Sequence, residues 1–192
     1  AQRAALPELP EARRARFVAE YGLPPYDAAW LTEDAGIASY FEQVARLTGN
    51  AKAASNWTMG ELARLMNERG HDIASQPVTA EALAGLLRLV AEGRITTPVA
   101  KTVFEKMYTT GRSAEDIVAA EGLARVDDEG AIAAAVAEVI ARHADAVAQY
   151  RAGRAQTFGF LVGQVMKASG GKASPALVTS LLRRALDAGT SS

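Results

Sequence analysis

The residues best equipped for chemistry in this sequence are cations near its C-terminal end. Gly171 and Lys172 resemble the end of a phosphate-binding P-loop. That motif also needs a glycine five residues before its second glycine and a Ser or Thr after the lysine. Met166 and Ala173 occupy these two positions, so the sequence excludes a P-loop.

Other groups that could catalyse or hold a metal are scarce. Asp127, Asp128 and Glu129 form a carboxylate run, but they lack the alternating ligand spacing of a calcium loop, so a solvated helix start is the better interpretation. The chain has no cysteine and only two histidines, His71 and His143, and it has no Gly-x-Ser-x-Gly motif. We therefore expect no catalytic residue, no metal site and no cofactor, and a chain that binds rather than catalyses.

The charge distribution points to the last part of the chain. Residues 1–149 hold 15 Lys and Arg against 21 Asp and Glu, whereas residues 150–192 hold 6 against 1. Such asymmetry is typical of a protein that binds an anion such as nucleic acid, although so few cations also suit an ordinary solvated surface. The candidate RNA-binding residues are Arg151, Arg154, Gln164, Lys167, Lys172, Arg183 and Arg184.

The same stretch predicts the helices that position these residues. Phe158, Leu161, Val162, Val165 and Met166 recur at helical spacing and predict one buried face. Gln164 and Lys167 are three apart, on a face that we expect to lie away from this stripe and to be free for RNA. Gly170-Gly171 should end the helix, and Ser174-Pro175 should begin the next.

Two further expectations concern how RNA is held. Lys172 lies on the glycine turn, whose backbone N–H groups could face a phosphate. Arg183 and Arg184 are weaker candidates, because cations near a helix C-terminus already have a structural use. No aromatic platform is interleaved with the cations as in single-strand binders, so we expect phosphate and shape contacts to a folded RNA rather than base stacking.

The whole chain predicts an all-α fold. Alanine is abundant, aromatic residues make up 6% of the chain, and helical apolar stripes alternate with glycine stops. The expected organisation is two helical bundle domains in tandem, with Asp127–Glu129 as the boundary. The expected domains are a connector with short helices over 1–35, a helical domain over 36–126 and a tail domain over 127–188. We expect a cytoplasmic protein, because no signal peptide or membrane span is evident, and a piece of a longer chain, because it begins without methionine.

Several motifs resemble the C-terminal part of the B subunit of the bacterial aspartyl/glutamyl-tRNA(Asn/Gln) amidotransferases, the GatB family, including its YqeY-like tail. The match extends from near residue 6 to near residue 187. The matching motifs are Leu6-Pro-Glu-Leu-Pro-Glu11, Arg16-Phe17, Tyr21-Gly-Leu23, Tyr26-Asp27, Ser55-Asn-Trp57, Met59-Gly-Glu-Leu62, Val103-Phe104, Tyr150-Arg-Ala-Gly153 and, most specific, Gly159-Phe-Leu-Val-Gly-Gln-Val-Met-Lys167.

The resemblance implies a role in converting Glu-tRNA(Gln) to Gln-tRNA(Gln), Asp-tRNA(Asn) to Asn-tRNA(Asn), or both. It implies that a preceding domain uses ATP and Mg²⁺, that a separate amidase subunit supplies ammonia, and that a small third subunit joins the two. The resemblance implies that the present sequence binds tRNA(Gln) or tRNA(Asn) and carries no catalytic residue. The sequence departs from the family at residues 141–145, where a turn is expected and a more helical stretch is predicted. The alternative function is a protein-docking helical bundle for another subunit or a synthetase.

Overall fold

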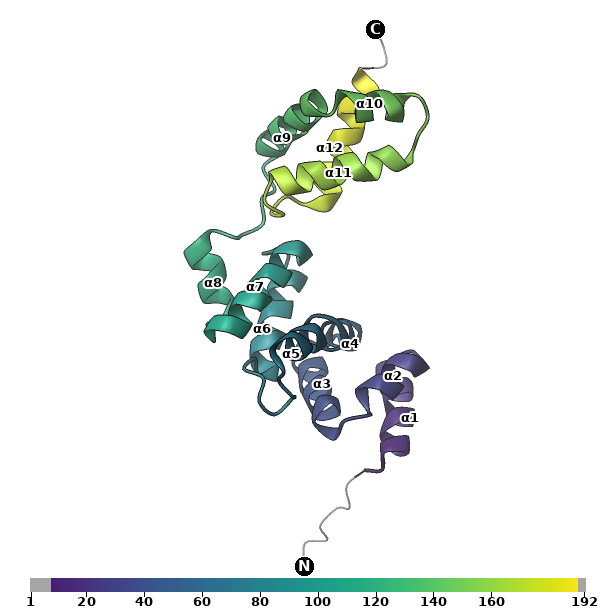
Figure 1. The fold of residues 1–192 in the computed structure, drawn as a ribbon, viewed down its shortest axis with the longest axis vertical. Coiled ribbons are helices and arrows are strands. Elements are labelled where there is room, and N and C mark those ends of the chain that lie inside the picture. The colour runs from purple at the N-terminus through teal and green to yellow at the C-terminus, as the bar shows by residue number, and fades with distance from the viewer. Residues whose placement is uncertain (1–7, 190–192) are drawn as a thin grey trace, which may run out of the picture. The chain divides into compact units, whose positions relative to one another are not determined.

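The computed structural model describes residues 8–189, whose regular structure is helical throughout (Figure 1). The predicted all-α class is confirmed, and the only β-type pairing among these residues is an isolated parallel bridge between Val126 and Ala173. Residues 1–7 of the predicted N-terminal connector lie outside the described residues. No helix of the described part is long and apolar enough to cross a membrane.

The described chain forms two compact units. The first contains the residues up to Ala91 together with Lys101–Ala120, and the second contains Glu92–Ala100 and the residues from Glu121 onward. The sequence-based boundaries at 36, 127 and 188 remain predictions. The first unit contains α1 (Pro10–Tyr21), α2 (Pro25–Leu31), α3 (Ala35–Thr48), α4 (Ala51–Trp57), the π-helix η1 (Thr58–Leu62), α5 (Ala63–Arg69) and α6 (Ala80–Ala91), and most of α7 (Thr97–Thr110) and α8 (Ala114–Glu121).

Aromatic residues hold the first unit together. Phe17 of α1 and Phe41 of α3 are fully buried, with 5.0 Å between their ring centroids. Trp57 meets Phe104 of α7 edge to face at 5.7 Å. Each such pair adds to the free energy gained by burying the rings, so these contacts fix α1 on α3 and α4 on α7.

The helical segment from Ala51 to Arg69 has regular ends but an irregular middle. The Asn50 side chain caps it by accepting a hydrogen bond from Ala53 N at 3.0 Å, and Gly70 closes it with φ 66°. Between them, Thr58–Leu62 adopts a π-helix, which apolar periodicity does not reveal.

The second unit contains α9 (Glu129–Arg142), α10 (Ala144–Arg151), α11 (Gln156–Ala168) and α12 (Pro175–Ala188). The predicted apolar stripes meet in one core in which Ile132, Leu161, Val165 and Leu182 are buried. Phe158, Val162 and Met166 pack against this core from its edge. Asp128 caps α9 by accepting from Gly130 N and Ala131 N, as predicted.

The expectation of a more helical stretch over residues 141–145 holds except at His143. His143 has φ −118° and ψ 47°, outside the helical region, so α9 ends at Arg142 and α10 begins at Ala144. The change of direction lets Val147 of α10 join the core that α9 also covers. The turn that the resemblance to the family implied is confined to His143.

The chain before α9 is tied to the glycine turn that follows α11. Val126 N donates to the carbonyl oxygen of Lys172 at 2.8 Å, and Ser174 N donates to that of Val126 at 3.3 Å. Ser174 occupies the predicted cap position of α12, but its hydroxyl makes no capping bond and instead accepts from the guanidinium of Arg125 at 3.0 Å.

Candidate nucleic-acid interface

The second unit is not strongly basic as a whole. Its described residues include 9 Lys and Arg and 8 Asp and Glu, because acids before residue 150 share the unit with the basic tail. Several of these acids are paired, with Asp127 2.8 Å from Arg125 and Glu138 2.7 Å from Arg142. Binding of an anion therefore depends on where the unpaired cations lie, not on net charge.

Two of the seven predicted residues contact a residue of another helix in the unit. The Arg151 guanidinium donates to the carbonyl oxygen of Leu186 at 3.5 Å, near the C-terminus of α12. Arg183 lies 5.3 Å above the centre of the Phe158 ring, a cation–π contact. Both cations contribute to packing within the unit, so they are weaker candidates for contact with RNA.

The other four predicted cations make few or no polar contacts with the rest of the unit. Lys167, Lys172 and Arg184 have no side-chain hydrogen bond or ion pair with another described residue. Arg154 is exposed on the connection between α10 and α11, and its single contact is a long one of 3.5 Å to Gln149 Oε1. A phosphate could bind these groups without breaking an existing ion pair.

The prediction that the glycine turn offers free N–H groups is wrong. Gly171 N donates to the carbonyl oxygen of Met166 at 2.8 Å, and Lys172 N to that of Ser169 at 3.2 Å. Gly170 N also donates to the carbonyl oxygen of Lys167, at 3.0 Å. These bonds satisfy the last carbonyls of α11, so the turn closes the helix, and only the Lys172 ammonium remains for an anion.

The prediction that Gln164 and Lys167 lie on an open face is partly wrong. Gln164 is half-buried, because α11 packs beside α9. Lys167 is exposed, and both residues line a hollow of about 320 Å³ together with Glu138, Arg142 and His143. Sequence spacing placed the two residues on one face correctly, but it could not show what packs against that face.

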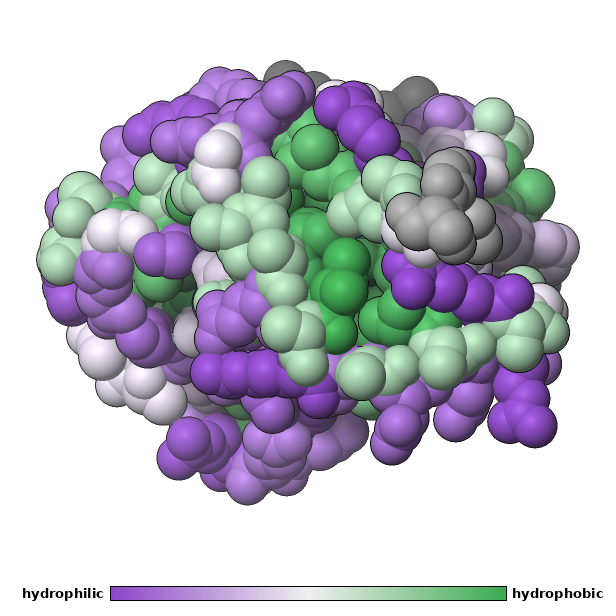
Figure 2. All heavy atoms as spheres, turned by 90° about the horizontal axis from the view of Figure 1, so that it is seen from above, coloured by the Kyte–Doolittle hydropathy of each residue, from purple (hydrophilic) through white to green (hydrophobic). Residues whose placement is uncertain are grey.

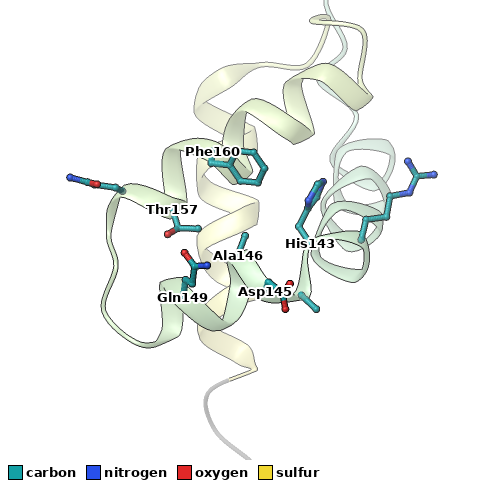
Figure 3. Close-up of a pocket in the computed structure, with 9 residues that line it drawn as sticks. His143, Asp145, Ala146, Gln149, Thr157 and Phe160 are labelled. Carbon is teal, nitrogen blue, oxygen red and sulfur yellow. The ribbon is translucent and has the colours of Figure 1, made fainter.

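A larger hollow of about 580 Å³ lies beside this one and shares Arg142 and His143 with it. Figure 3 shows His143, Phe160, Thr157 and Gln149 surrounding the hollow, with Asp145 at its rim. None of these residues was a sequence-based candidate. A signal existed for Phe160, because it is an aromatic residue off the apolar stripe of its helix, and it is 48% exposed.

The expectation that no aromatic group lies among the cations is therefore also wrong. The two hollows bring the Phe160 and His143 rings together with Arg142, Gln164 and Lys167. The Arg154 guanidinium lies 3.5 Å from Oε1 of Gln149, which lines the larger hollow. Two of the seven predicted residues, Gln164 and Lys167, thus lie beside Arg142 and His143. Arg151 and Arg184 border other hollows.

A different surface of the unit is apolar. Figure 2 shows green and pale-green side chains at the surface around a hollow bordered by purple polar ones. Between α9 and α12, a groove of about 580 Å³ is lined almost wholly by apolar side chains. These residues include Ala133, Val136, Ile140, Leu181 and Ala185, and Arg184 borders them. Among residues 8–189, no three His, Asp or Glu side chains cluster in a way that could hold a metal ion.

Known proteins match this chain over nearly its whole length. The model of the GatB domain matches residues 39–186. The B subunit of the aspartyl/glutamyl-tRNA(Asn/Gln) amidotransferase of Prosthecochloris aestuarii is 50% identical over 184 residues, which is 96% of this chain and 38% of that protein. The corresponding protein of Geotalea uraniireducens is 49% identical over 185 residues, 96% of this chain and 39% of its own. The chain thus spans about two fifths of the length of these relatives, and it belongs to the GatB family.

Proposed function

We propose that the second unit of this chain binds tRNA for an amidotransferase of the GatB family. The observation that carries the proposal is that Gln164 and Lys167 lie beside Arg142 and His143, with unpaired ammonium groups at Lys167 and Lys172 and an exposed Arg154 next to Gln149. Phosphate contacts to such cations provide most of the affinity of many proteins for nucleic acid.

The wider activity is proposed by family membership. The relatives' names describe an amidotransferase that acts with aspartyl- or glutamyl-tRNA(Asn/Gln). We propose that the protein to which this chain belongs amidates one or both of these aminoacyl groups, in a complex with two further subunits, an amidase and a small third protein. The use of ATP and Mg²⁺ is assigned to sequence outside this chain, and the chain itself is proposed to bind and not to catalyse.

The proposed contact is with a folded RNA. Arg154 precedes α11, Lys167 lies in its last turn and Lys172 follows it, so the cations are spread along α11 and not gathered in one pocket. Phosphates of successive nucleotides could bind them in turn. Such contacts give affinity with little base specificity, so shape must supply much of the discrimination between tRNAs.

The test is tRNA binding by the 192-residue chain across a salt series. Fluorescently labelled tRNA(Gln) and tRNA(Asn) transcripts are titrated between about 50 and 200 mM salt, with a non-cognate tRNA as the control. A complex with several phosphate contacts should weaken by about tenfold to 1,000-fold over this range. Absence of binding to any tRNA at the lowest salt concentration would contradict the proposal.

A protein-docking role is the second candidate, and the apolar groove between α9 and α12 favours it. Small alanine side chains leave room there for a partner helix, a recognition mode that depends on apolar contact. An interface of this kind is far less sensitive to salt than phosphate contacts. Weak, salt-independent association with tRNA, beside tight binding of another protein of the complex, would favour docking over tRNA binding.

A further inference from the structure

We propose that the larger hollow holds one unstacked base of the bound RNA, with Phe160 as its stacking surface. The proposal rests on the proposed tRNA binding and adds a specific ligand group to it. Phosphate contacts alone leave the hollow unused, and its walls differ in character from the rest of the candidate interface.

The aromatic wall is preformed. The Phe160 and His143 rings lie edge to face, with 5.4 Å between centroids and 89° between planes. Phe160 is 48% exposed, whereas Leu161 and Val165, which form part of the apolar stripe of the same helix, are fully buried. An aromatic ring that is held in place by a neighbouring ring and still open to solvent is a suitable platform for a base.

The opposite wall is polar. Gln149 of α10 and Thr157 of α11 border the hollow in Figure 3, and the Asp145 carboxylate lies at its rim. An amide and a hydroxyl can both donate and accept, so they can meet the mixed donor and acceptor edge of a base. The carboxylate accepts only, which disfavours a bare phosphate in the same place and suits an amino group of a base.

Two arginines are available for the RNA phosphates on either side of an inserted base. Arg142 lines the hollow at the end of α9, and its ion pair with Glu138 is exposed to solvent, so a phosphate could compete for the guanidinium. Arg154 lies outside the hollow, with its guanidinium 3.5 Å from Oε1 of Gln149, which lines it. The volume of about 580 Å³ accommodates a base with its ribose. The combination of aromatic platform, polar edge and flanking cations is the chemistry of single-stranded RNA recognition.

The test is a double-mutant cycle between the protein and the tRNA. Phe160→Leu keeps an apolar side chain but removes the flat ring, and Phe160→Trp keeps a stacking surface. Tyr26→Leu is the matched control, because Tyr26 is an exposed aromatic residue outside this unit, at 73%. Each unpaired loop nucleotide of the tRNA is replaced in turn by an abasic one, and circular dichroism checks each protein fold.

The proposal expects Phe160→Leu to weaken tRNA binding about tenfold, with an unchanged salt slope because no phosphate contact is lost. Phe160→Trp and Tyr26→Leu should bind as the wild type does. One abasic tRNA should also bind about tenfold more weakly, and Phe160→Leu should not weaken that complex further.

Two outcomes would overturn the proposal, and they separate it from tRNA binding itself. If the wild type binds tRNA but Phe160→Leu has no effect, or its effect adds to that of every abasic substitution, no base occupies the hollow and the tRNA-binding function stands. If the wild type binds no tRNA, both proposals fail, and Phe160 is an exposed ring on a protein-docking unit.

Discussion

The ring of Phe160 stands edge-on to the imidazole of His143, 17 positions earlier in the chain, with 5.4 Å between the ring centroids. This contact depends on the helix break at His143, whose φ of −118° ends α9. Had α9 continued, residue 143 would have followed the helical path of its neighbours. The break therefore creates both the aromatic pair and the hollow beside it.

The adjacent arginines of α12 should differ in their effect on stability. Arg183→Gln removes the cation that lies 5.3 Å above the Phe158 ring, so it should lower the free energy of unfolding by about 0.5–1 kcal/mol. Arg184→Gln removes a side chain with no polar partner among the described residues and should change it by less than about 0.5 kcal/mol. Urea denaturation measures both, and equal losses would contradict this assignment.

The turn that carries Lys172 should require its second glycine. Gly171 has φ 75°, and an added Cβ would also lie 3.5 Å from Pro98 Cβ. Gly171→Ala should lower the free energy of unfolding by about 1–2 kcal/mol, because an L-residue is strained there. Gly85→Ala is the control, since Gly85 lies within α6 with no atom within 4 Å of an added Cβ.

Helix propensity predicts that Gly85→Ala raises the free energy of unfolding by about 0.5–1 kcal/mol. Thermal and urea unfolding of the two variants give the comparison. A stabilised Gly171→Ala variant would show that the turn does not need the left-handed conformation.

The π-helix contains a hydroxyl without a partner. Thr58 is 1% exposed, and its Oγ1 forms no hydrogen bond. Thr58→Val keeps the shape and removes the buried polar atom, so it should raise the free energy of unfolding by about 1 kcal/mol. Nearby Ser55 is buried too, but its hydroxyl donates to Asp27 Oδ2 at 3.2 Å, so Ser55→Ala should lower it by about 1 kcal/mol. Destabilisation by Thr58→Val would mean that the hydroxyl has a partner in solution.

The first unit should lose stability in acid through Glu42. Burial works to raise the pKa of Glu42, but hydrogen bonds and charges from Arg16 and Arg13 outweigh it and hold the pKa below its usual 4.5. A carboxyl group whose pKa is lower in the folded state stabilises the protein above its unfolded pKa, and this contribution is lost as the pH falls through the folded pKa.

Glu42→Gln should therefore lower the free energy of unfolding at pH 7 by about 1–2 kcal/mol and have little effect near pH 2. Urea denaturation at both pH values measures the difference. Glu33→Gln is a suitable control, because Glu33 is exposed. An equal loss at both pH values would show that the ion pairs of Glu42 do not stabilise the fold.

Local patterns in the sequence predicted most of the fold. The apolar stripe from Phe158 to Met166, the helix end before Gly170-Gly171 and the helix start at Ser174-Pro175 all recur in the structure, because each depends on residues within about one helical turn. The break at His143 and the π-helix at Thr58–Leu62 were not predicted. His143 contacts Phe160, and Trp57, just before the π-helix, contacts Phe104; apolar periodicity does not show contacts between residues so distant in sequence.

The candidate interface was predicted less completely. Charge counting found Arg154, Lys167 and Lys172, which remain unpaired or weakly paired in the structure. It could not show that Arg151 bonds to Leu186 O or that the N–H groups of the glycine turn close α11. Nor could it bring Phe160 to His143, since that juxtaposition depends on how α10 and α11 pack.

The central claim is that the cations of the second unit bind tRNA phosphates. The most direct measurement is the salt dependence of tRNA affinity for the wild type and for Arg154→Ala combined with Lys172→Ala. Each lost phosphate contact should reduce the slope of log K against log salt by about 0.9, so the double variant should bind more weakly with a slope smaller by about 1.8. If circular dichroism shows an intact fold and both affinity and slope stay at the wild-type values, these cations do not bind tRNA.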